Sequence, residues 1–284
     1  MNCETAMTGA QPAIEAAKDA ERRWHDSFYR EHARGDYPAT PAEFCERFRR
    51  VELTAFCEGG WSWWADPRAE VLQSLGDVRS MRVLDYGCGS GTLGMYLSLC
   101  GAQVWGFDLS GEAIQVANEV ARRYGVSAQF EQGDAEELKF ADEFFDLVIG
   151  FGVLHHVIKY QRASAQLRRI LRVGAKAIFI ETLWDNPAIN LIRRFTTEDE
   201  EAGDAHLTET NIRSFAQDFG DCQLQKRHLL YMLKRLAKLP DRNLANPLKR
   251  RQLWLAVKRL DSMLLGYCSP LRRYCGEVII SLQK

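Results

Sequence analysis

A glycine-rich turn directly after a short apolar run constrains the fold of this chain more than any other feature. The apolar run covers 81–84 and is followed at once by an acidic residue, Asp85. Gly87, Gly89 and Gly91 come next at alternate positions, and a helix-like stretch begins after them. Glycine has no side chain, so a ligand can lie directly on the backbone of such a turn. The pattern therefore predicts a strand, a tight ligand-binding turn and the start of a helix.

Two classes of ligand fit this turn. The spacing from Gly89 to Gly94 matches the G-x-G-x-x-G pattern of dinucleotide-binding proteins, which alone is a weak signal. The acid at the end of the strand, however, favours a ligand with a cationic group over one that presents only phosphates. S-adenosylmethionine meets this requirement, because it carries an ammonium, a sulfonium and an adenosine. A second expected strand, 103–109, contains Asp108, whose carboxylate can accept both ribose hydroxyls of either cofactor.

Two further expected strands extend the pattern. The strand 128–132 is followed by Asp134, and an acid there can accept a hydrogen bond from an adenine amino group. The strand 144–149 runs into Gly-Phe-Gly-Val-Leu-His-His at 150–156. Acids at three successive strand ends, followed by a Leu-His-His turn, resemble the class I S-adenosylmethionine-dependent methyltransferases of the small-molecule type. The resemblance covers 81–183 well and the flanking segments loosely.

The resemblance implies a role for each of these strand ends. Asp85 is expected near the methionine ammonium of S-adenosylmethionine, Asp108 on the ribose hydroxyls and Asp134 on the adenine amino group. The other expected cofactor-binding residues lie in the adjoining turns: Gly87, Gly89, Leu109, Ala135, Gly150 and Phe151. Methyl transfer from a sulfonium is an in-line displacement, so the protein mainly has to orient the two reactants and exclude water.

Three residues are candidates for catalysis. His155 and His156 end the fourth expected strand, where the methyl acceptor should approach. A histidine can act as a general base near neutral pH. Leu-His-His is nevertheless common in the resembled family whatever the acceptor, which favours a structural or pocket-lining role. Glu181, near the end of the expected strand 175–183, is the third candidate, and a solvated strand-end acid is its alternative reading.

Strands and helices alternate through the central part of the chain, which predicts an α/β fold. We expect a Rossmann-like, doubly wound, seven-stranded sheet with a cofactor-binding core at 79–230 and a last strand at 275–284. In the resembled family that last strand is antiparallel. The other expected elements are helices at 111–124, 163–171 and 211–219, a turn at 173–174, and strands at 222–229 and 277–282.

A mainly helical cap is expected over the carboxyl ends of the strands, where ligands bind in this type of sheet. It would combine the lead-in 1–78 with insertions after the fifth and sixth strands, at 184–207 and 231–274. The segment 1–20 is expected to be disordered or loosely helical. Aromatic residues crowd the lead-in, and three of them are candidates for the substrate pocket: Tyr29, Trp63 and Trp64. Core packing of the cap is their default reading, and a wall for a flat or apolar acceptor is the alternative.

Charge restricts the partners of this chain. The formal net charge is −1, so no global field points to DNA. The segment 224–284 nevertheless holds 14 Lys and Arg residues against three acids. A solvated helix face, an anionic substrate or membrane-surface acceptor, and RNA are three readings of this excess. The turn after the fourth strand lacks the Asn/Asp-Pro-Pro-aromatic pattern of nucleic-acid amino methylases, which speaks against a nucleobase acceptor.

Cysteine usage and hydropathy place the chain in a reducing, aqueous compartment. None of the eight cysteines forms a C-x-x-C pair, so the spacing indicates neither a zinc site nor a disulfide framework, and no metal ligands are expected. We find no signal-peptide pattern in 1–23 and no apolar stretch near the roughly 20 residues that span a bilayer. A cytoplasmic protein is expected.

The sequence thus predicts S-adenosylmethionine-dependent methyl transfer to an O, N or C atom of a small molecule, such as a secondary metabolite, quinone, lipid or isoprenoid. An RNA methyltransferase and a non-catalytic S-adenosylmethionine-binding protein are the alternatives, followed by a nicotinamide dehydrogenase. The sequence predicts neither the acceptor nor the oligomeric state.

Overall fold

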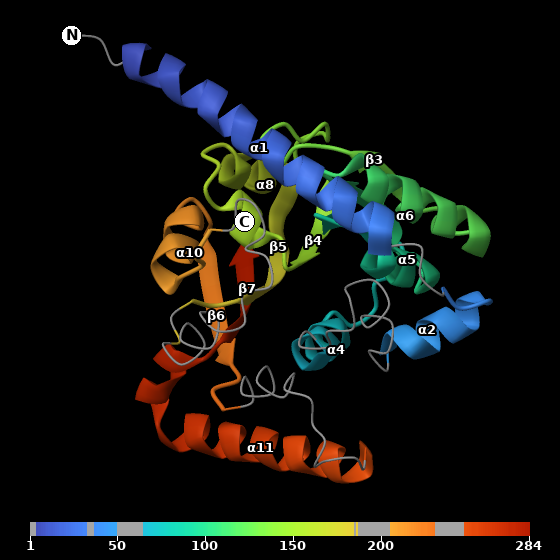
Figure 1. Cartoon of the computed structure of the whole chain (residues 1–284), viewed down its shortest axis with the longest axis vertical. Coiled ribbons are helices and arrows are strands. Elements are labelled where there is room, and N and C mark those ends of the chain that lie inside the picture. Colours follow the sequence, from blue (N-terminus) through green and yellow to red (C-terminus); the bar gives the residue numbers. More distant parts are fainter. Residues whose placement is uncertain (1–3, 33–36, 50–64, 185, 187–204, 231–246) are drawn as a thin grey trace.

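The computed structural model describes residues 4–32, 37–49, 65–184, 186, 205–230 and 247–284 (Figure 1). Its centre is one seven-stranded sheet with the strand order β3-β2-β1-β4-β5-β7-β6. The first five strands in this order run parallel, and β7 pairs antiparallel with both β5 and β6. The strands are β1 (Arg82–Tyr86), β2 (Gln103–Asp108), β3 (Gln129–Gln132), β4 (Phe145–Phe151), β5 (Leu171–Thr182), β6 (Asp221–Arg227) and β7 (Glu277–Gln283).

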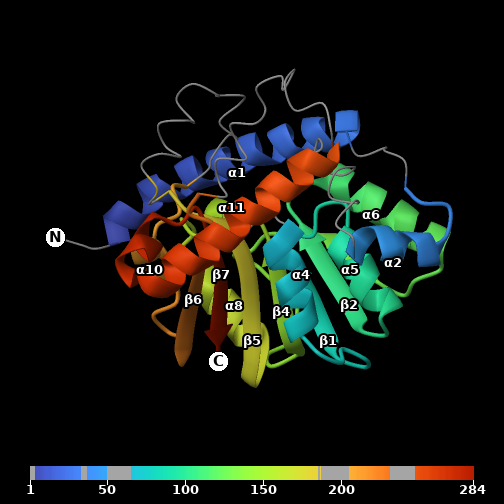
Figure 2. The same cartoon turned by 90° about the horizontal axis from the view of Figure 1, so that it is seen from below.

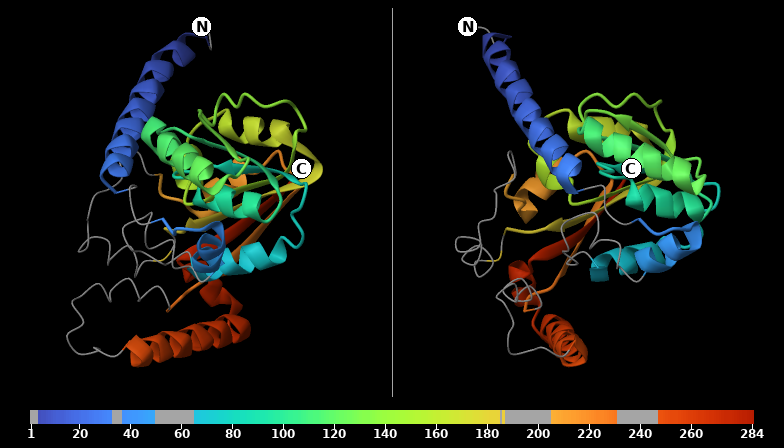
Figure 3. Two further views of the ribbon diagram at one scale, coloured as in Figure 1. Left: turned by 90° about the vertical axis from the view of Figure 1, so that its right-hand side faces the viewer. Right: turned by 45° about the vertical axis from the view of Figure 1, so that its right-hand side comes forward.

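Helices cover both faces of this sheet (Figure 3). One buried cluster joins the sheet to α7, α8 and α10, and a second joins it to α2, α4, α5 and α6. The helices are α1 (Glu4–His32), α2 (Pro41–Arg49), α4 (Ala65–Ser74), α5 (Thr92–Leu99), α6 (Gly111–Tyr124), α7 (Leu154–Val157), α8 (Ala163–Ile170), α10 (Glu209–Phe215), α11 (Pro247–Tyr267) and the 3₁₀ helix η2 (Ser269–Tyr274). This confirms the expected doubly wound sheet with an antiparallel last strand.

Local sequence explains the best-defined helix, α6. Its N-cap is Ser110, whose hydroxyl accepts a hydrogen bond from the N–H of Ala113. It ends at Gly125, which adopts a left-handed conformation with φ 64°. Small and apolar residues one turn apart, including Ala113, Ile114 and Ala117, are buried against the sheet. The expected helix 111–124 is thus reproduced without a shift.

The structure moves several other boundaries. The residues around the turn expected at 173–174 lie within β5, which begins at Leu171, but they interrupt its pairing with β4, because the register passes from Phe145 paired with Leu171 to Leu147 paired with Lys176. Gly174 does adopt a positive φ of 80°, and the pairing of β4 with β5 shifts register nearby, between Phe145 and Leu147. The strand therefore begins earlier than expected, and the local turn preference is expressed within it as an irregularity in its pairing. The helix expected at 211–219 begins two residues earlier, behind the N-cap Thr208, and ends at Phe215.

Within the described residues, the N-terminal segment forms one long helix, which agrees with the helical alternative for 1–20 and not with the disordered one. From Glu4 onward α1 is continuous to His32, and it crosses the carboxyl ends of the parallel strands beside α6 (Figures 1 and 2). Helix α11 lies on the opposite side of the molecule from α1 (Figure 1) and contacts η2. None of the described helices is long and apolar enough to cross a membrane. The expected domain boundaries at 78, 230 and 274 stay predictions.

Candidate active site

The glycine turn after β1 has a backbone that only glycine adopts easily. Gly87, Gly89 and Gly91 have φ values of 63°, 50° and 72°, a region that side chains disfavour. A Cβ atom on Gly87 would lie 2.2 Å from the side chain of Val153, and one on Gly89 would lie 2.3 Å from the hydroxyl oxygen of Tyr29. The loop after β4 and helix α1 therefore both reach this turn.

One predicted carboxylate, Asp108, holds the glycine turn, and a second, Asp85, holds helix α5, which follows the turn. The N–H of Gly89 donates to Asp108 Oδ2 at 2.8 Å, and the N–H of Ser110 donates to Asp108 Oδ1 at 2.9 Å. The N–H of Gly94 donates to Asp85 Oδ2 at 2.8 Å. The ends of β2 and β1 are thus joined to the turn and to the helix after it, and each carboxylate oxygen keeps a second lone pair for a ligand.

Asp85 is the most strongly perturbed of these acids. Its side chain is buried, and this burial is the largest influence on its carboxyl, raising the pKa to about 7. The charge of Asp108 raises it further, while the Gly94 N–H and the Arg68 guanidinium oppose the shift. A buried carboxylate in this state gains most from a cation placed close to it.

The third predicted acid, Asp134, is already paired with a lysine of α1. Lys18 Nζ lies 2.6 Å from Asp134 Oδ2 and 2.7 Å from Glu136 Oε2, and its side chain is buried. Burial alone would lower the pKa of Lys18, but the hydrogen bonds to these two acids raise it overall. The neighbouring Ala135 is buried, and Leu109 is half-buried. An adenine amino group at Asp134 would thus share that carboxylate with Lys18.

The end of β4 lies directly beside the glycine turn. Gly150 is packed so closely that a Cβ atom there would approach the carbonyl oxygen of Tyr86 to 2.8 Å. The ring of Phe151 is half-buried, and the guanidinium of Arg68 lies 5.0 Å from its centre. Strand order reverses between β1 and β4, which is where ligands bind in open α/β sheets. The predicted residues of both loops therefore meet at this switch point.

Glu181 is fully buried, so the reading as a solvated strand-end acid is wrong. Its Oε1 accepts hydrogen bonds from the N–H groups of Val153 at 2.9 Å and Leu154 at 2.6 Å. Its Oε2 lies 2.8 Å from Nδ1 of His155. One carboxylate thus satisfies the first N–H groups of α7 and orients the imidazole that follows.

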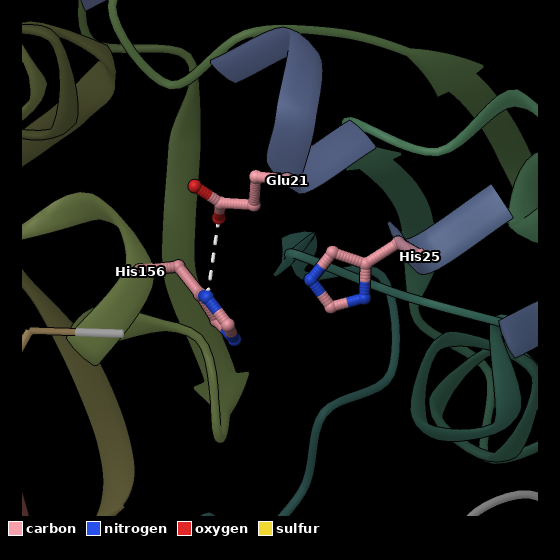
Figure 4. A group of neighbouring side chains, drawn as sticks. All are labelled: Glu21, His25 and His156. Atoms are coloured by element: carbon pink, nitrogen blue, oxygen red, sulfur yellow. Dashed lines mark ion pairs between the residues drawn. The ribbon is translucent and has the colours of Figure 1, made fainter. Parts of the chain in front are cut away.

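His156 faces α1 instead of β5. Its Nδ1 lies 3.1 Å from Oε1 of Glu21, and both side chains are buried (Figure 4). The other oxygen, Oε2, accepts a hydrogen bond from the Tyr160 hydroxyl at 3.0 Å and lies 3.3 Å from Lys159 Nζ. Burial raises the pKa of Glu21, but the contacts with His156, Lys159 and Tyr160 outweigh it and lower the pKa overall.

Helix α1 brings further side chains that the sequence reasoning missed. The ring of His25 lies 5.0 Å from that of His156 at an angle of 75° (Figure 4). Asp26 Oδ1 accepts a hydrogen bond from the Ser110 hydroxyl at 2.6 Å. The i, i+4 spacing of Glu21 and His25 on one helix face was the available signal.

Of the expected substrate-pocket residues, only Tyr29 lies within the described part of the chain. Its side chain rests against the glycine turn, at Gly89, so it borders the expected cofactor site. Trp63 and Trp64 fall outside the described residues.

Comparison with known proteins agrees with this geometry. Residues 83–174 match the family model described as a methyltransferase domain. A ubiquinone biosynthesis O-methyltransferase of Alkalilimnicola ehrlichii is 34% identical over 151 residues, which cover 48% of this chain and 60% of the relative. A second, from Ralstonia nicotianae, is 28% identical over 205 residues, covering 63% and 84%. The chain spans about half the length of the first curated relatives it matches.

Two solved structures share the fold. Phosphoethanolamine N-methyltransferase 2 of Haemonchus contortus, in complex with S-adenosyl-L-methionine, has a TM-score of 0.53 at 17% identity, covering 85% of this chain and 60% of that one. Magnesium protoporphyrin IX methyltransferase of Synechocystis has a TM-score of 0.52 at 17% identity, covering 93% and 98%. The match of 83–174 to a methyltransferase domain and the shared fold agree with the resemblance to the class I S-adenosylmethionine-dependent methyltransferases. The relatives matched in sequence bear the name of an O-methyltransferase.

Proposed function

We propose that this chain binds S-adenosylmethionine at the carboxyl ends of β1, β2 and β3 and transfers its methyl group to an oxygen atom of a small molecule. One observation carries the proposal. Two acids from neighbouring strand ends, Asp108 and Asp85, hold the glycine turn and the start of α5, respectively, at the switch point of the sheet. A glycine turn without side chains, next to two carboxylates, suits a cationic nucleoside as the ligand.

The site residues fit the parts of that cofactor. Asp108 is held by two backbone N–H groups with lone pairs left for the ribose hydroxyls. The buried Asp85 favours the methionine ammonium, directly or through a water molecule. Asp134 and the backbone N–H of Ala135 are suited to the edge of the adenine ring, and Leu109 to its face. Gly150 and Phe151 would then border the methionine end.

The residues after β4 suit the acceptor side. S-adenosylmethionine supplies a methyl group that its sulfonium already activates. His155 is held through Nδ1 by Glu181, which leaves Nε2 to accept the proton of an acceptor hydroxyl. The side chain of His155 is 19% exposed, whereas that of His156 is 8% exposed, which favours His155 for contact with the acceptor. Glu181 acts as a positioning residue in this scheme.

The relatives suggest the class of acceptor. Their names, ubiquinone biosynthesis O-methyltransferase, favour an oxygen acceptor on a small molecule of the quinone type. Aromatic residues of α1 beside the glycine turn, such as Tyr29, are compatible with a flat acceptor. The proposal of a quinone-type acceptor does not require that the acceptor be anionic or lie at a membrane surface. It also assigns no role to the basic C-terminal helix.

Binding and transfer can be tested separately. Isothermal titration should show binding of S-adenosylhomocysteine and none of NAD. Transfer of radiolabelled methyl groups should then be followed with hydroxylated aromatic and quinone precursors, with primary amines, and with total RNA. We expect methylation of a hydroxyl compound and none of RNA. Binding without transfer to any acceptor would support a non-catalytic protein, and absence of S-adenosylhomocysteine binding would refute the proposal.

A further inference from the structure

Glu21, His25 and His156 form a compact group of metal-binding side chains outside the expected cofactor residues. One carboxylate oxygen and one ring nitrogen from each histidine all lie within 4.8 Å of one another. Glu21 and His25 lie one turn apart on α1, and His156 comes from α7 (Figure 4). Within the described part of the chain, no other group of three histidine, cysteine or acidic residues is this close.

The distances are close to those of a tetrahedral site. Zinc binds nitrogen and carboxylate oxygen at about 2.0–2.2 Å, which puts neighbouring donors about 3.3–3.5 Å apart. Glu21 Oε1 and His156 Nδ1 are already 3.1 Å apart. Two imidazoles on one such ion have ring centres about 5 Å apart, and the rings of His25 and His156 lie 5.0 Å apart. A ring nitrogen of His25 lies within 4.8 Å of both other donor atoms.

Neighbouring side chains orient the carboxylate of this group, and two of its three members are buried. Tyr160 and Lys159 contact Oε2 of Glu21, and the other carboxylate oxygen, Oε1, lies toward His156. Such outer contacts orient metal ligands and are a regular part of metal sites. Glu21 and His156 are buried, which limits competition from water. The carboxylate also offsets part of the charge of an added cation, beside the ammonium of Lys159.

We propose that Glu21, His25 and His156 together bind one divalent transition-metal ion. Two imidazoles and one carboxylate are the ligand set of several zinc sites that keep a fourth position open. The ion would join α1 to α7 and thereby fix the N-terminal helix across the strand ends. This inference does not depend on the proposed methyl transfer, because it concerns only the three ligands and the two helices that carry them.

Zinc binding to the full chain tests the proposal. After dialysis against a chelator, titration with Zn²⁺ should show one ion bound per chain and a rise in melting temperature. Co²⁺ should give the intense visible absorption of four-coordinate nitrogen and oxygen ligands. His25→Ala and Glu21→Gln should each weaken Zn²⁺ binding by at least about tenfold and remove the rise in melting temperature.

Two control variants separate this site from adventitious surface binding. Glu31→Gln changes an exposed glutamate on the same helix, and His206→Ala removes an exposed histidine elsewhere. Both should bind Zn²⁺ like the unmodified chain. Absence of binding, a Co²⁺ spectrum of six-coordinate type, unchanged affinity in His25→Ala, or an equal loss in His206→Ala would each overturn the proposal. Should His25→Ala unfold, as judged by circular dichroism, the Co²⁺ spectrum of the unmodified chain still decides.

Discussion

The carboxylate of Asp108 accepts the backbone N–H of Gly89 at 2.8 Å, and this bond ties the end of β2 to the turn that follows β1. The same carboxylate also accepts the N–H of Ser110, which is the N-cap of α6. One side chain thereby fixes the turn and the start of the next helix, with its remaining lone pairs facing the proposed ribose site.

Replacing Asp108 should therefore weaken cofactor binding. Asp108→Ala removes both the bracing of the turn and the proposed ribose acceptor, so the dissociation constant for S-adenosylhomocysteine should rise by at least about tenfold. Asp142→Ala, on an exposed acid that pairs with Arg169, is the control and should leave it unchanged. Isothermal titration gives both values. An unaltered dissociation constant in Asp108→Ala would remove the ribose assignment.

His155 and Glu181 should affect turnover more than cofactor binding. His155→Ala and His156→Ala should each keep the dissociation constant for S-adenosylhomocysteine within about twofold, because both lie on the proposed acceptor side. His155→Ala should lower kcat by about 10²-fold or more. Glu181→Gln keeps an oxygen for the Val153 and Leu154 N–H groups and should lower kcat while the chain stays folded. Loss of cofactor binding in either histidine variant would contradict this placement.

Asp85 should make stability depend on pH. Its pKa in the folded chain is about 7, above the ordinary value of 3.8, so folding disfavours the charged form. The favourable contribution of the neutral carboxyl is complete below about pH 4 and is lost as the pH rises through 7. Asp85→Asn removes this dependence. The free energy of unfolding of Asp85→Asn, relative to the unmodified chain, should therefore increase between pH 5 and pH 8 in urea titrations. A constant difference across this window would speak against the raised pKa.

Gly89 offers a test of the contact between α1 and the glycine turn. Gly89→Ala places a methyl group 2.3 Å from the Tyr29 hydroxyl, at a residue with φ 50°. Gly125→Ala is the matched control, since it has φ 64° and nothing within 4 Å of the added atom. Both should lose about 1–2 kcal/mol of stability to backbone strain. Only Gly89→Ala should also weaken S-adenosylhomocysteine binding. Adding Tyr29→Ala to Gly89→Ala should restore part of that binding. Equal effects of the two alanines on ligand binding would exclude the contact.

The sheet was predictable because its evidence is local. Apolar runs, each followed by an acid or glycines, mark the strands around Asp85, Asp108 and Asp134, and the alternation with helices such as α6 defines the fold class. The same local evidence misplaced the start of β5, since Gly174 has the conformation of a turn residue inside a paired strand. The start of β5 depends on pairing with other parts of the chain, such as Leu171 with Phe145 and Gly174 with Lys284, and one segment of sequence does not show these partners.

The acceptor side was less predictable for a physical reason. The amphipathic pattern of α1 shows that the helix has a buried face but not which element it packs against. The pairing of Lys18 with Asp134, and of Glu21 with His156, depends on that choice. Glu181 was open to a solvated interpretation because two of its three partners are backbone N–H groups at the start of α7, which carry no residue-specific signal.

Lys18 connects helix α1 to the proposed adenine end of the cofactor site. Its ammonium lies on Asp134 and Glu136, and the first of these is the acid proposed for the adenine amino group. With the nucleoside held as proposed, its adenine amino group would share the Asp134 carboxylate with the ammonium of Lys18 on α1. Because Lys18 and Glu136 are buried, salt screens their ion pair only weakly, so this link between α1 and the adenine end should persist at high ionic strength. Movement of helix α1, which carries Lys18, would thus influence how fast the spent nucleoside leaves.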